Sequence, residues 1–537
     1  MTFLGTFARR LGGFGRREDG AIAVQFAFLA LPVTVLAFGM VDVNRASVAK
    51  KDLQDALDAA TLLAGRSSAV SNSDLQTIGA AALAAQLSGM SDATLVSSTF
   101  TVSGSSVTSS ATVKLTPIVA NLWLNKDMEV SAGSQIVRTV NKLEVALVLD
   151  NTGSMAGNKL TNLKAAATDF IDQLAAAAAR STEPNPVKIG IVPFSNAVRL
   201  SSTTSELNTY KSAAWMDAAG ANFASRQIFN GEVKNRFSLF TTLNQPWAGC
   251  VESRVAPYDV QDTSSTASVP DTLYTPYFYP DAADSGGSGS SSGYDSNNYL
   301  KDSPSYTYYG TAEINAANGS TKLNGLLTNS NLTTTDKKMI LAQGNPAKYN
   351  RTISVAGPNA GCTMQPLSRL STNWTSLKSK ITAMNAVGET HIPLGMAWGW
   401  NVLAPSGPFG DGVAYNTPKT TKVVVLMTDG ENTYNDNGKY NGSAYDGYGY
   451  IWQNRTGTVG SGRTTAIDNR LKAICTNMKA AGIVIYTVRV EVTTGSSSLL
   501  QNCATTPDKF YDVQSASNLT AVFSAIAGSI ENLRITQ

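Results

Sequence analysis

The apolar residues of this chain follow three successive patterns before residue 120. From 21 to 41 they form a nearly continuous run, broken only by Gln25 and Thr34. From 45 to 66 they recur every three or four residues, as on one face of an α-helix. From 94 to 116 apolar and polar residues alternate, which is the period of a β-strand. These patterns predict an apolar helix, then an amphipathic helix, then strands, with a further helix over 72–87.

Beyond residue 140, runs rich in Val and Leu alternate with amphipathic helices. The predicted strands are 143–149, 187–194, 422–427, 483–490 and 509–513, and the predicted helices are 159–174, 392–403, 464–481 and 518–533. Continuous apolar runs are typical of strands that are buried on both faces of a parallel sheet. Their alternation with helices predicts an α/β fold with a doubly wound, mostly parallel sheet. A long stretch rich in Ser, Asn and Tyr, at about 196–381, interrupts the alternation and is expected to be an inserted subdomain.

The apolar run is long enough to cross a membrane. Its 21 residues would form a helix of about 30 Å, which is the thickness of a bilayer core. A secretory signal peptide would have a shorter apolar stretch, so we expect a retained anchor. Slightly more basic residues precede the run than follow it, which favours a cytoplasmic N-terminus. These residues are Arg9, Arg10, Arg16 and Arg17 before it, and Arg45, Lys50 and Lys51 after it.

The predicted organisation therefore has four parts. They are a cytoplasmic N-terminus (1–20), a transmembrane helix (21–43), a periplasmic stalk helix with a small α+β module (44–140), and an α/β domain with its insertion (141–537). The formal net charge of +3 argues against a nucleic-acid partner.

Four cysteines, all beyond the apolar run, lack the C-x-x-C spacing of metal sites. Two disulfides are expected, which suits an oxidising compartment such as the bacterial periplasm. Three pairings are possible. We favour Cys250–Cys362 and Cys475–Cys503, because each keeps to one region of the chain, and four buried free thiols are the alternative.

Two predicted strands each end close to an aspartate, Asp150 and Asp429. Asp150 begins the motif DNTGSM, which places the hydroxyls of Thr152 and Ser154 two residues apart. Parallel strands present their carboxyl ends at one edge of the sheet, where open α/β sheets bind ligands. Carboxylate and hydroxyl oxygens suit Mg²⁺ first, or Mn²⁺ or Ca²⁺, whereas no thiolate or imidazole near Asp150 favours zinc or copper. We expect Asp150 to be a surface ligand of this cation site.

The residues around Asp150 could also cap a helix or take part in catalysis. Asp-x-Thr at a strand end is common at helix N-termini, here ahead of 159–174. An aspartic protease needs two Asp-Thr-Gly motifs, but Asn151 separates Asp150 from Thr-Gly and the chain has no second copy. The single histidine, His391, leaves no choice of base for a Ser-His-Asp triad and excludes a multi-histidine zinc site. We therefore expect no catalytic residues.

The motifs at the two aspartates resemble the metal-ion-dependent adhesion site of von Willebrand factor type A domains. That pattern is Asp-x-Ser-x-Ser, a distal Thr and a distal Asp-Gly, which here correspond to Asp150, Thr152, Ser154, Thr390 and Asp429. Thr152 replaces the first serine and keeps the hydroxyl. The resemblance implies a type A fold and a divalent cation, Mg²⁺ first, that binds an acidic side chain of a protein partner.

The N-terminal part resembles TadG-like proteins of the tight-adherence (Flp) pilus system. The resemblance rests on RREDGAIAVQFA at 16–27 and LQDALDAA at 53–60. It implies a single-pass protein of the bacterial inner membrane, with most of the chain in the periplasm and pilus-assembly components as partners. Gly20-Ala21 is similar to a prepilin cleavage site, but Gln25 replaces the usual glutamate, so we expect no cleavage.

A second tyrosine-rich segment begins soon after Asp429. Tyr434, Tyr440 and Tyr445 lie in it, among Gly, Ser and Asn, which is the composition of adaptable recognition loops. We expect these tyrosines to form a rim around the cation and to contact the partner; an ordinary solvated insertion is the alternative. For the whole chain, the alternatives are a surface adhesin or receptor unrelated to pili and a metal-dependent hydrolase.

Overall fold

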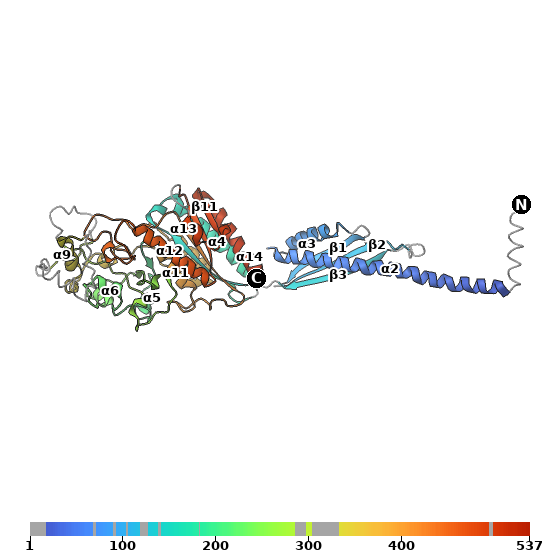
Figure 1. Ribbon diagram of the computed structural model, residues 1–537, viewed down its shortest axis with the longest axis horizontal. Coiled ribbons are helices and arrows are strands. Elements are labelled where there is room, and N and C mark those ends of the chain that lie inside the picture. The colour runs from blue at the N-terminus through green and yellow to red at the C-terminus, as the bar shows by residue number, and fades with distance from the viewer. Residues whose placement is uncertain are drawn as a thin grey trace. The chain divides into compact units, whose positions relative to one another are not determined.

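The structure is a computed structural model that divides into two compact units (Figure 1). One unit is formed mainly by Met1–Val140, the other mainly by Asn141–Ala179 and Glu183–Ile535. The structure describes residues 18–67, 71–89, 93–103, 106–118, 127–137, 141–181, 183–284, 297–302, 332–492 and 498–536. Most of the expected cytoplasmic segment 1–20 therefore lies outside the described residues.

The N-terminal unit packs two helices against a three-stranded antiparallel sheet. The helices are α2 (Glu18–Arg66) and α3 (Asn72–Leu87), and the strands, in the order β1-β2-β3, are β1 (Ala93–Ser103), β2 (Ser106–Leu115) and β3 (Met128–Val137). The expected anchor and stalk helices form one continuous helix, α2. Strand β3 was not predicted, and it completes the sheet on the far side of β2.

The two halves of α2 have different surroundings. In the later half, Leu53, Leu57 and Ala64 are fully buried against the sheet and α3. In the earlier half, large apolar side chains are exposed, including Phe28 at 79% and Met40 at 73%. By length and composition, Gln25–Arg66 is the one helix among the described residues that could cross a membrane.

The second unit is built on a six-stranded sheet, ordered β11-β10-β9-β4-β5-β8. Neighbouring strands run parallel except at the edge, where β8 is antiparallel to β5. The strands are β4 (Lys142–Asp150), β5 (Val187–Phe194), β8 (Ser368–Ser371), β9 (Thr420–Thr428), β10 (Val484–Val490) and β11 (Phe510–Val513). The unit is thus mixed α/β with a mostly parallel sheet, as the alternation of strands and helices predicted.

Helices cover both faces of this sheet, which explains why the central strands carry apolar residues on both faces. In β4, Leu143, Val145 and Leu147 point into one core, whereas Ala146 and Val148 point into the other. The first core is closed by α4 (Asn158–Ala179), α10 (Trp374–Thr382) and α14 (Leu519–Thr536), and the second by α11 (Ile392–Leu403), α12 (Arg463–Ala480) and α13 (Ser498–Cys503). Both β8 and α10 belong to this framework, although their residues were expected to lie in the insertion.

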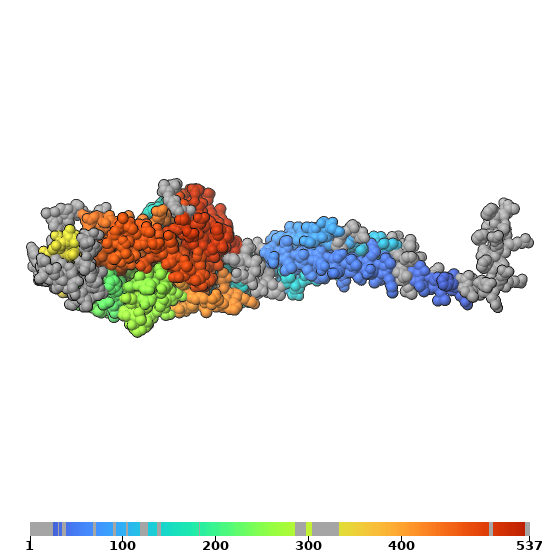
Figure 2. Space-filling view, viewed as in Figure 1, coloured from blue at the N-terminus to red at the C-terminus, as the bar shows by residue number. Residues whose placement is uncertain are grey.

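The insertion packs against the second core. Its regular elements are short: β6 (Val198–Arg199), α5 (Thr204–Lys211), α6 (Phe223–Gln227), α7 (Arg236–Thr242), β7 (Cys250–Val251) and α9 (Thr334–Gln343). Glu252 is fully buried and forms ion pairs with Arg236 and Arg455, the latter at 2.6 Å. On the face shown in Figure 2, green residues of the insertion lie against orange residues that follow β9, in agreement with the ion pair between Glu252 and Arg455.

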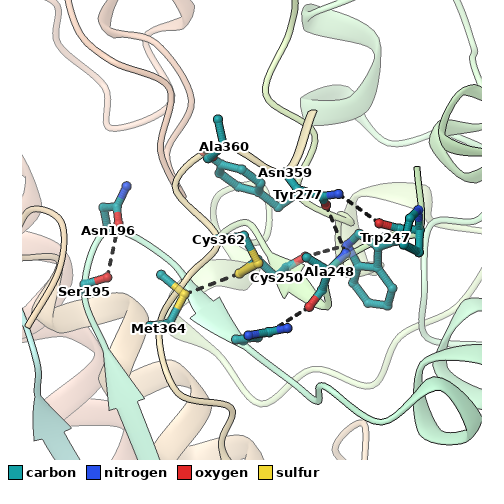
Figure 3. The surroundings of a disulfide bond; sticks show 12 residues. Ser195, Asn196, Trp247, Ala248, Cys250, Tyr277, Asn359, Ala360, Cys362 and Met364 are labelled. Atoms are coloured by element: carbon teal, nitrogen blue, oxygen red, sulfur yellow. Dashed lines mark hydrogen bonds between the residues drawn. A yellow bond between two sulfur atoms is a disulfide. The ribbon is translucent and has the colours of Figure 1, made fainter. Parts of the chain in front are cut away.

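Two disulfides hold the second unit, and they join the pairs that the sequence favoured: Cys250–Cys362 and Cys475–Cys503. The first links β7 to the segment that precedes β8. Around it, Trp247 Nε1 donates a hydrogen bond to Cys250 O at 2.9 Å, and Tyr277 Oη donates one to Ala360 O at 3.0 Å (Figure 3). The second links α12 to α13.

Gly190 in β5 tests how closely α11 and β8 pack against the sheet. A Cβ atom on this glycine would clash with Val402 Cγ1 and lie 3.0 Å from Ser368 O. We expect Gly190→Ala to lower the free energy of unfolding by about 1–3 kcal/mol, which is typical of overpacking. Denaturant unfolding of the full chain in detergent, followed by tryptophan fluorescence, measures the change.

Gly528→Ala in α14 is the matched control. A Cβ atom there meets nothing within 4 Å, and Ala favours helix over Gly. The control should be neutral or stabilising by up to about 1 kcal/mol. An equal loss of stability in both variants would contradict this close packing.

Candidate cation site

The candidate site lies where the connections of the sheet change direction. From β4 the chain passes to β5 on one side, and it later returns to the other side of β4 with β9, β10 and β11. Ligands of open α/β sheets bind at such a switch point, beyond the carboxyl ends of the strands. Strands β4 and β9 are paired so that Leu149 is opposite Met427. The next residues of both strands, including Asp150 and Asp429, therefore meet at one edge.

Asp150 is fully buried, so the expectation of a surface ligand was wrong. Its Oδ1 accepts a hydrogen bond from Thr152 N at 2.8 Å, and its Oδ2 accepts one from Thr428 Oγ1 at 2.6 Å. Burial, helped by the nearby Asp429, raises the pKa of Asp150 to about 6, although the two hydrogen bonds act in the opposite direction. The carboxyl group is therefore held in place by the turn after β4 and by the last residue of β9, while burial makes its charged form less favourable.

The two hydroxyls of the DNTGSM motif converge on the second aspartate. Thr152 Oγ1 is 3.0 Å from Ser154 Oγ, which donates a hydrogen bond to Asp429 Oδ1 at 2.7 Å. Thr152 precedes a short 3₁₀ helix (Gly153–Met155), but its side chain makes no capping hydrogen bond. The Ser154 hydroxyl therefore faces Asp429, and the Thr152 hydroxyl lies beside it without capping this 3₁₀ helix.

The segment before α11 lies beside this loop and brings Thr390 to it. Gly153 N donates to Gly388 O at 3.0 Å, and Val387 N donates to Asn151 O at 2.8 Å. A Cβ atom on Gly430 would lie 3.8 Å from Thr390 Oγ1, so this hydroxyl is next to the Asp429-Gly430 turn. All five residues expected in the cation site are thus gathered at one edge of the sheet.

The three tyrosines expected to form a partner-binding rim are buried. Tyr434, Tyr440 and Tyr445 are only 4%, 8% and 1% exposed, so the prediction of a contact rim was wrong. Tyr445 Oη donates a hydrogen bond to Glu252 Oε1 at 2.6 Å, and Tyr440 Oη donates one to Gln343 Oε1 at 2.8 Å. Their hydroxyls pair with polar groups of the insertion, which explains how a segment rich in polar residues becomes part of the core.

Two residues of the site were not predicted from the sequence. Thr428 holds Asp150, and Lys159 Nζ donates to Asp429 Oδ2 at 2.7 Å. Thr428 is the last residue of β9, and Lys159 is in the first turn of α4. In the sequence, only their closeness to Asp429 and to the DNTGSM motif could have indicated a role in the site. The contacts of both residues span more than 250 positions of sequence, which local patterns do not reveal.

The chemistry of the site suits a hard divalent cation. Its candidate ligands are all oxygens of carboxylates and hydroxyls, which Mg²⁺, Mn²⁺ and Ca²⁺ prefer. Ser154 is exposed, whereas Thr152 and Asp429 are buried, so the set opens to solvent on the Ser154 side. In the structure, the ammonium group of Lys159 supplies positive charge at Asp429.

Comparison with known proteins gives one family match. A family model described as "Putative Flp pilus-assembly TadE/G-like" matches residues 20–67, which confirms the resemblance of the N-terminal part. This match covers the greater part of α2 and leaves the α/β unit outside it. A comparison with curated protein sequences found no match.

Several solved structures are distantly similar. The vWF domain of the type V pili tip protein Mfa5 from Porphyromonas gingivalis is 11% identical, with a TM-score of 0.31, over 74% of this chain and 97% of that one. The pilus adhesin SpaC from Lactobacillus rhamnosus GG is 11% identical, with a TM-score of 0.32, over 82% of this chain and 35% of that one. Proximal thread matrix protein 1 from the mussel byssus is 12% identical, with a TM-score of 0.26, over 74% and 47%. Similarities of this size carry no functional argument.

The raised pKa of Asp150 predicts a pH effect in the absence of cations. The pKa of Asp150 in the folded state is above its ordinary value of 3.8. Between about pH 4 and pH 6, the folded state therefore keeps a proton on Asp150 that the unfolded state has lost. The resulting stabilisation is complete below about pH 4 and disappears as the pH rises through about 6. A shift of this size corresponds to about 3 kcal/mol.

Asp150→Asn removes this titration and can keep both hydrogen bonds, because the amide oxygen accepts from Thr152 N and its NH₂ group donates to Thr428 Oγ1. In a chelator, the stability of the native chain relative to Asp150→Asn should fall between about pH 4 and pH 6. Denaturant unfolding at a series of pH values measures it. Parallel curves for the two proteins would show that the Asp150 pKa is not raised.

Lys159 predicts a charge effect on cation binding. Its ammonium group is within hydrogen-bonding distance of Asp429 Oδ2, so it competes with a cation for that carboxylate. Lys159→Met keeps the aliphatic part of the side chain and removes the charge. We expect Mg²⁺ to bind about tenfold more tightly, or about 1.4 kcal/mol. Calorimetry measures the affinity, with Lys164→Met in the same helix as the control.

Proposed function

We propose that this chain is a membrane-anchored, periplasmic component of tight-adherence (Flp) pilus assembly with a von Willebrand factor type A-like domain. In this proposal, Asp150, Thr152, Ser154, Thr390 and Asp429 bind one divalent cation, Mg²⁺ first or else Mn²⁺ or Ca²⁺. An acidic side chain of a partner protein completes the coordination. The role is binding, without catalysis.

The spacing of three oxygen atoms is the observation on which the proposal mainly depends. Around octahedral Mg²⁺, with bonds of about 2.0–2.1 Å, adjacent ligand oxygens are about 2.9 Å apart. Thr152 Oγ1 and Ser154 Oγ are 3.0 Å apart, and Ser154 Oγ and Asp429 Oδ1 are 2.7 Å apart. Direct ligation by these three atoms therefore needs little rearrangement. Buried Asp150 would act behind them, through a bound water or hydroxyl.

The local charges favour an acidic partner group. A divalent cation and Lys159 together carry three positive charges, whereas Asp150 and Asp429 carry two negative charges. One positive charge is therefore left unbalanced among these groups. The exposed position of Ser154 leaves the approach from solvent open on that side. A carboxylate that enters there supplies both a hard oxygen ligand and the missing negative charge.

The N-terminal helix supports the membrane and pilus parts of the proposal. Its exposed apolar side chains, such as Phe28 and Met40, have no cover within the described part of the N-terminal unit and would be covered by lipid. The same helix contains the match to Flp pilus-assembly proteins. Two disulfides in the second unit suit the oxidising periplasm, which favours a cation site outside the cytoplasm.

Two other functions are less well supported. A surface adhesin or receptor unrelated to pili would use the same cation site, but it gives no reason for the family match at 20–67. A metal-dependent hydrolase needs a base that accepts a proton from bound water. His391, the single histidine, is fully buried, and burial lowers its pKa to about 4, which makes it a poor base at neutral pH.

Ser154→Ala tests the proposal, because it removes one exposed hydroxyl and leaves the core unchanged. We expect at least about tenfold weaker Mg²⁺ binding and loss of partner capture. The full chain is purified in detergent and used to capture proteins from envelope extracts, with Mg²⁺ or with a chelator. Partners are identified by mass spectrometry, and calorimetry measures cation binding.

Ser379→Ala, an exposed serine in α10 away from the site, is the matched control and should behave as the native chain. Capture of pilus-assembly components that requires Mg²⁺ supports the proposal. If calorimetry shows no divalent-cation binding to the native chain, the cation site is rejected. If Mg²⁺-dependent partners belong to no pilus system, the adhesin or receptor alternative replaces it.

A further inference from the structure

A second group of potential metal ligands lies behind the candidate cation site. Glu389 and His391 flank Thr390, and Asp446 comes from the tyrosine-rich segment after β9. One ligand atom from each of these three residues lies within 4.8 Å of the other two. In an extended segment, successive side chains point to opposite sides. Glu389 and His391 can therefore point to one side while Thr390, between them, points to the other.

The end of β5 holds both segments in place. His391 N donates a hydrogen bond to Ser195 O at 3.3 Å, and Gly447 N donates one to Asn196 O at 2.7 Å. These two bonds fix the backbone next to His391 and next to Asp446. The three side chains therefore meet because two distant segments attach to neighbouring residues of one strand end.

His391 is buried without a hydrogen-bond partner among the described residues. Its side chain is fully inaccessible, and neither ring nitrogen makes a hydrogen bond of good geometry with this part of the chain, although the backbone of Thr433 lies near the ring. Leaving a buried polar group without a hydrogen bond is costly, so such a group is unusual. The rings of Tyr434 and Tyr448 pack around it, with centroids 5.8 Å and 5.2 Å away. A neutral imidazole in this position has a free lone pair, as a metal ligand requires.

The carboxylates are placed to complete the group. Asp446 Oδ1 accepts a hydrogen bond from Tyr448 N at 2.7 Å, while Oδ2 lies 3.4 Å from His391 Nε2. In a tetrahedral zinc site with bonds near about 2.0–2.1 Å, ligand atoms are about 3.3 Å apart, which agrees with that distance. Glu389 is only partly buried, so the group can be reached from its side.

We propose that Glu389, His391 and Asp446 form a second metal site, specific for Zn²⁺, with a water molecule as the fourth ligand. One imidazole and two carboxylates suit zinc, whereas the all-oxygen site at Asp150 suits Mg²⁺. The ion would also neutralise two carboxylates that lie close together in the interior.

Zinc in this site would fix the segment that carries Thr390, since its ligands are the residues immediately before and after that threonine. The second site is independent of the proposed function, because its ligands differ from those of the first site. The two proposals can therefore fail separately.

The test measures Zn²⁺ binding to the full chain in detergent, purified with a tag that contains no histidine and stripped of metal. Calorimetry is done with saturating Mg²⁺ present, so that the first site is filled. We expect one equivalent of Zn²⁺ to bind. Co²⁺ in its place should give the intense visible absorption of tetrahedral coordination, which Mg²⁺ does not abolish.

Glu389→Gln is the main variant, because its partly exposed side chain can change without disturbing the core. We expect Zn²⁺ affinity to fall at least tenfold while the thermal unfolding of the metal-free protein is unchanged. Glu431→Gln, an exposed glutamate beside Asp429, is the matched control and should bind Zn²⁺ as the native chain does. Asp446→Asn gives a second, independent loss of affinity.

Ser154→Ala separates the two sites. It should retain the equivalent of Zn²⁺ even though it binds Mg²⁺ weakly. The proposal is overturned if the native chain binds Zn²⁺ no better than Glu389→Gln does. It is also overturned if Ser154→Ala loses the Zn²⁺, because the ion would then occupy the first site.

Discussion

The parallel pairing of β4 with β9 is the constraint on which the candidate site depends. These strands are far apart in the sequence, and their register places Leu149 opposite Met427, so that the chain leaves both strands at the same level. A slip of one residue would turn the side chains of one strand to the opposite face. Because both faces are buried in separate cores, that slip would disrupt the packing on each side. Core packing thus fixes the relative height of Asp150 and Asp429.

The same pairing explains why a buried carboxyl group is tolerated at Asp150. A carboxylate without partners in the interior is costly. Here Thr428, the last residue of β9, donates a hydrogen bond from the neighbouring strand, and Thr152 N donates another from the turn. The raised pKa shows that these bonds offset the loss of hydration only in part. A divalent cation would supply the remaining stabilisation, so local electrostatics and the proposed cation binding are linked.

The fold of the α/β unit was largely predictable, because both of its signals are local. Val- and Leu-rich runs predicted β4, β5, β9 and β10 within a few residues, and helical spacing predicted α4, α11, α12 and α14. Strand β8 has only four residues, with an edge position and no apolar run, so it left no such signal. Both aspartates were identified because a charged residue that ends an apolar run is conspicuous.

The features that were not predicted depend on contacts between distant segments. Lys159 and Thr428 look like ordinary residues of a helix and a strand until the sheet brings them to the aspartates. Tyr434, Tyr440 and Tyr445 lie in a polar, glycine-rich segment, and that composition predicted exposure. The hydroxyls of Tyr440 and Tyr445 find partners in the insertion, Gln343 and Glu252, which lie 97 and 193 residues earlier in the chain, and the hydroxyl of Tyr434 bonds to Gly449 O within its own segment.

The segment before α11 shows how one short stretch can serve two surroundings. Gly388 has φ of +74°, and a side chain there would collide with Asn196 at the end of β5, so glycine is needed for this close approach. That approach fixes the next three residues between the DNTGSM loop and the tyrosine-rich segment. Thr390 lies by Asp429-Gly430, whereas His391 is enclosed by tyrosine rings. Tyr434 and Tyr448, both buried, therefore enclose the imidazole of His391 on one side, and the carboxylates of Glu389 and Asp446 lie near it.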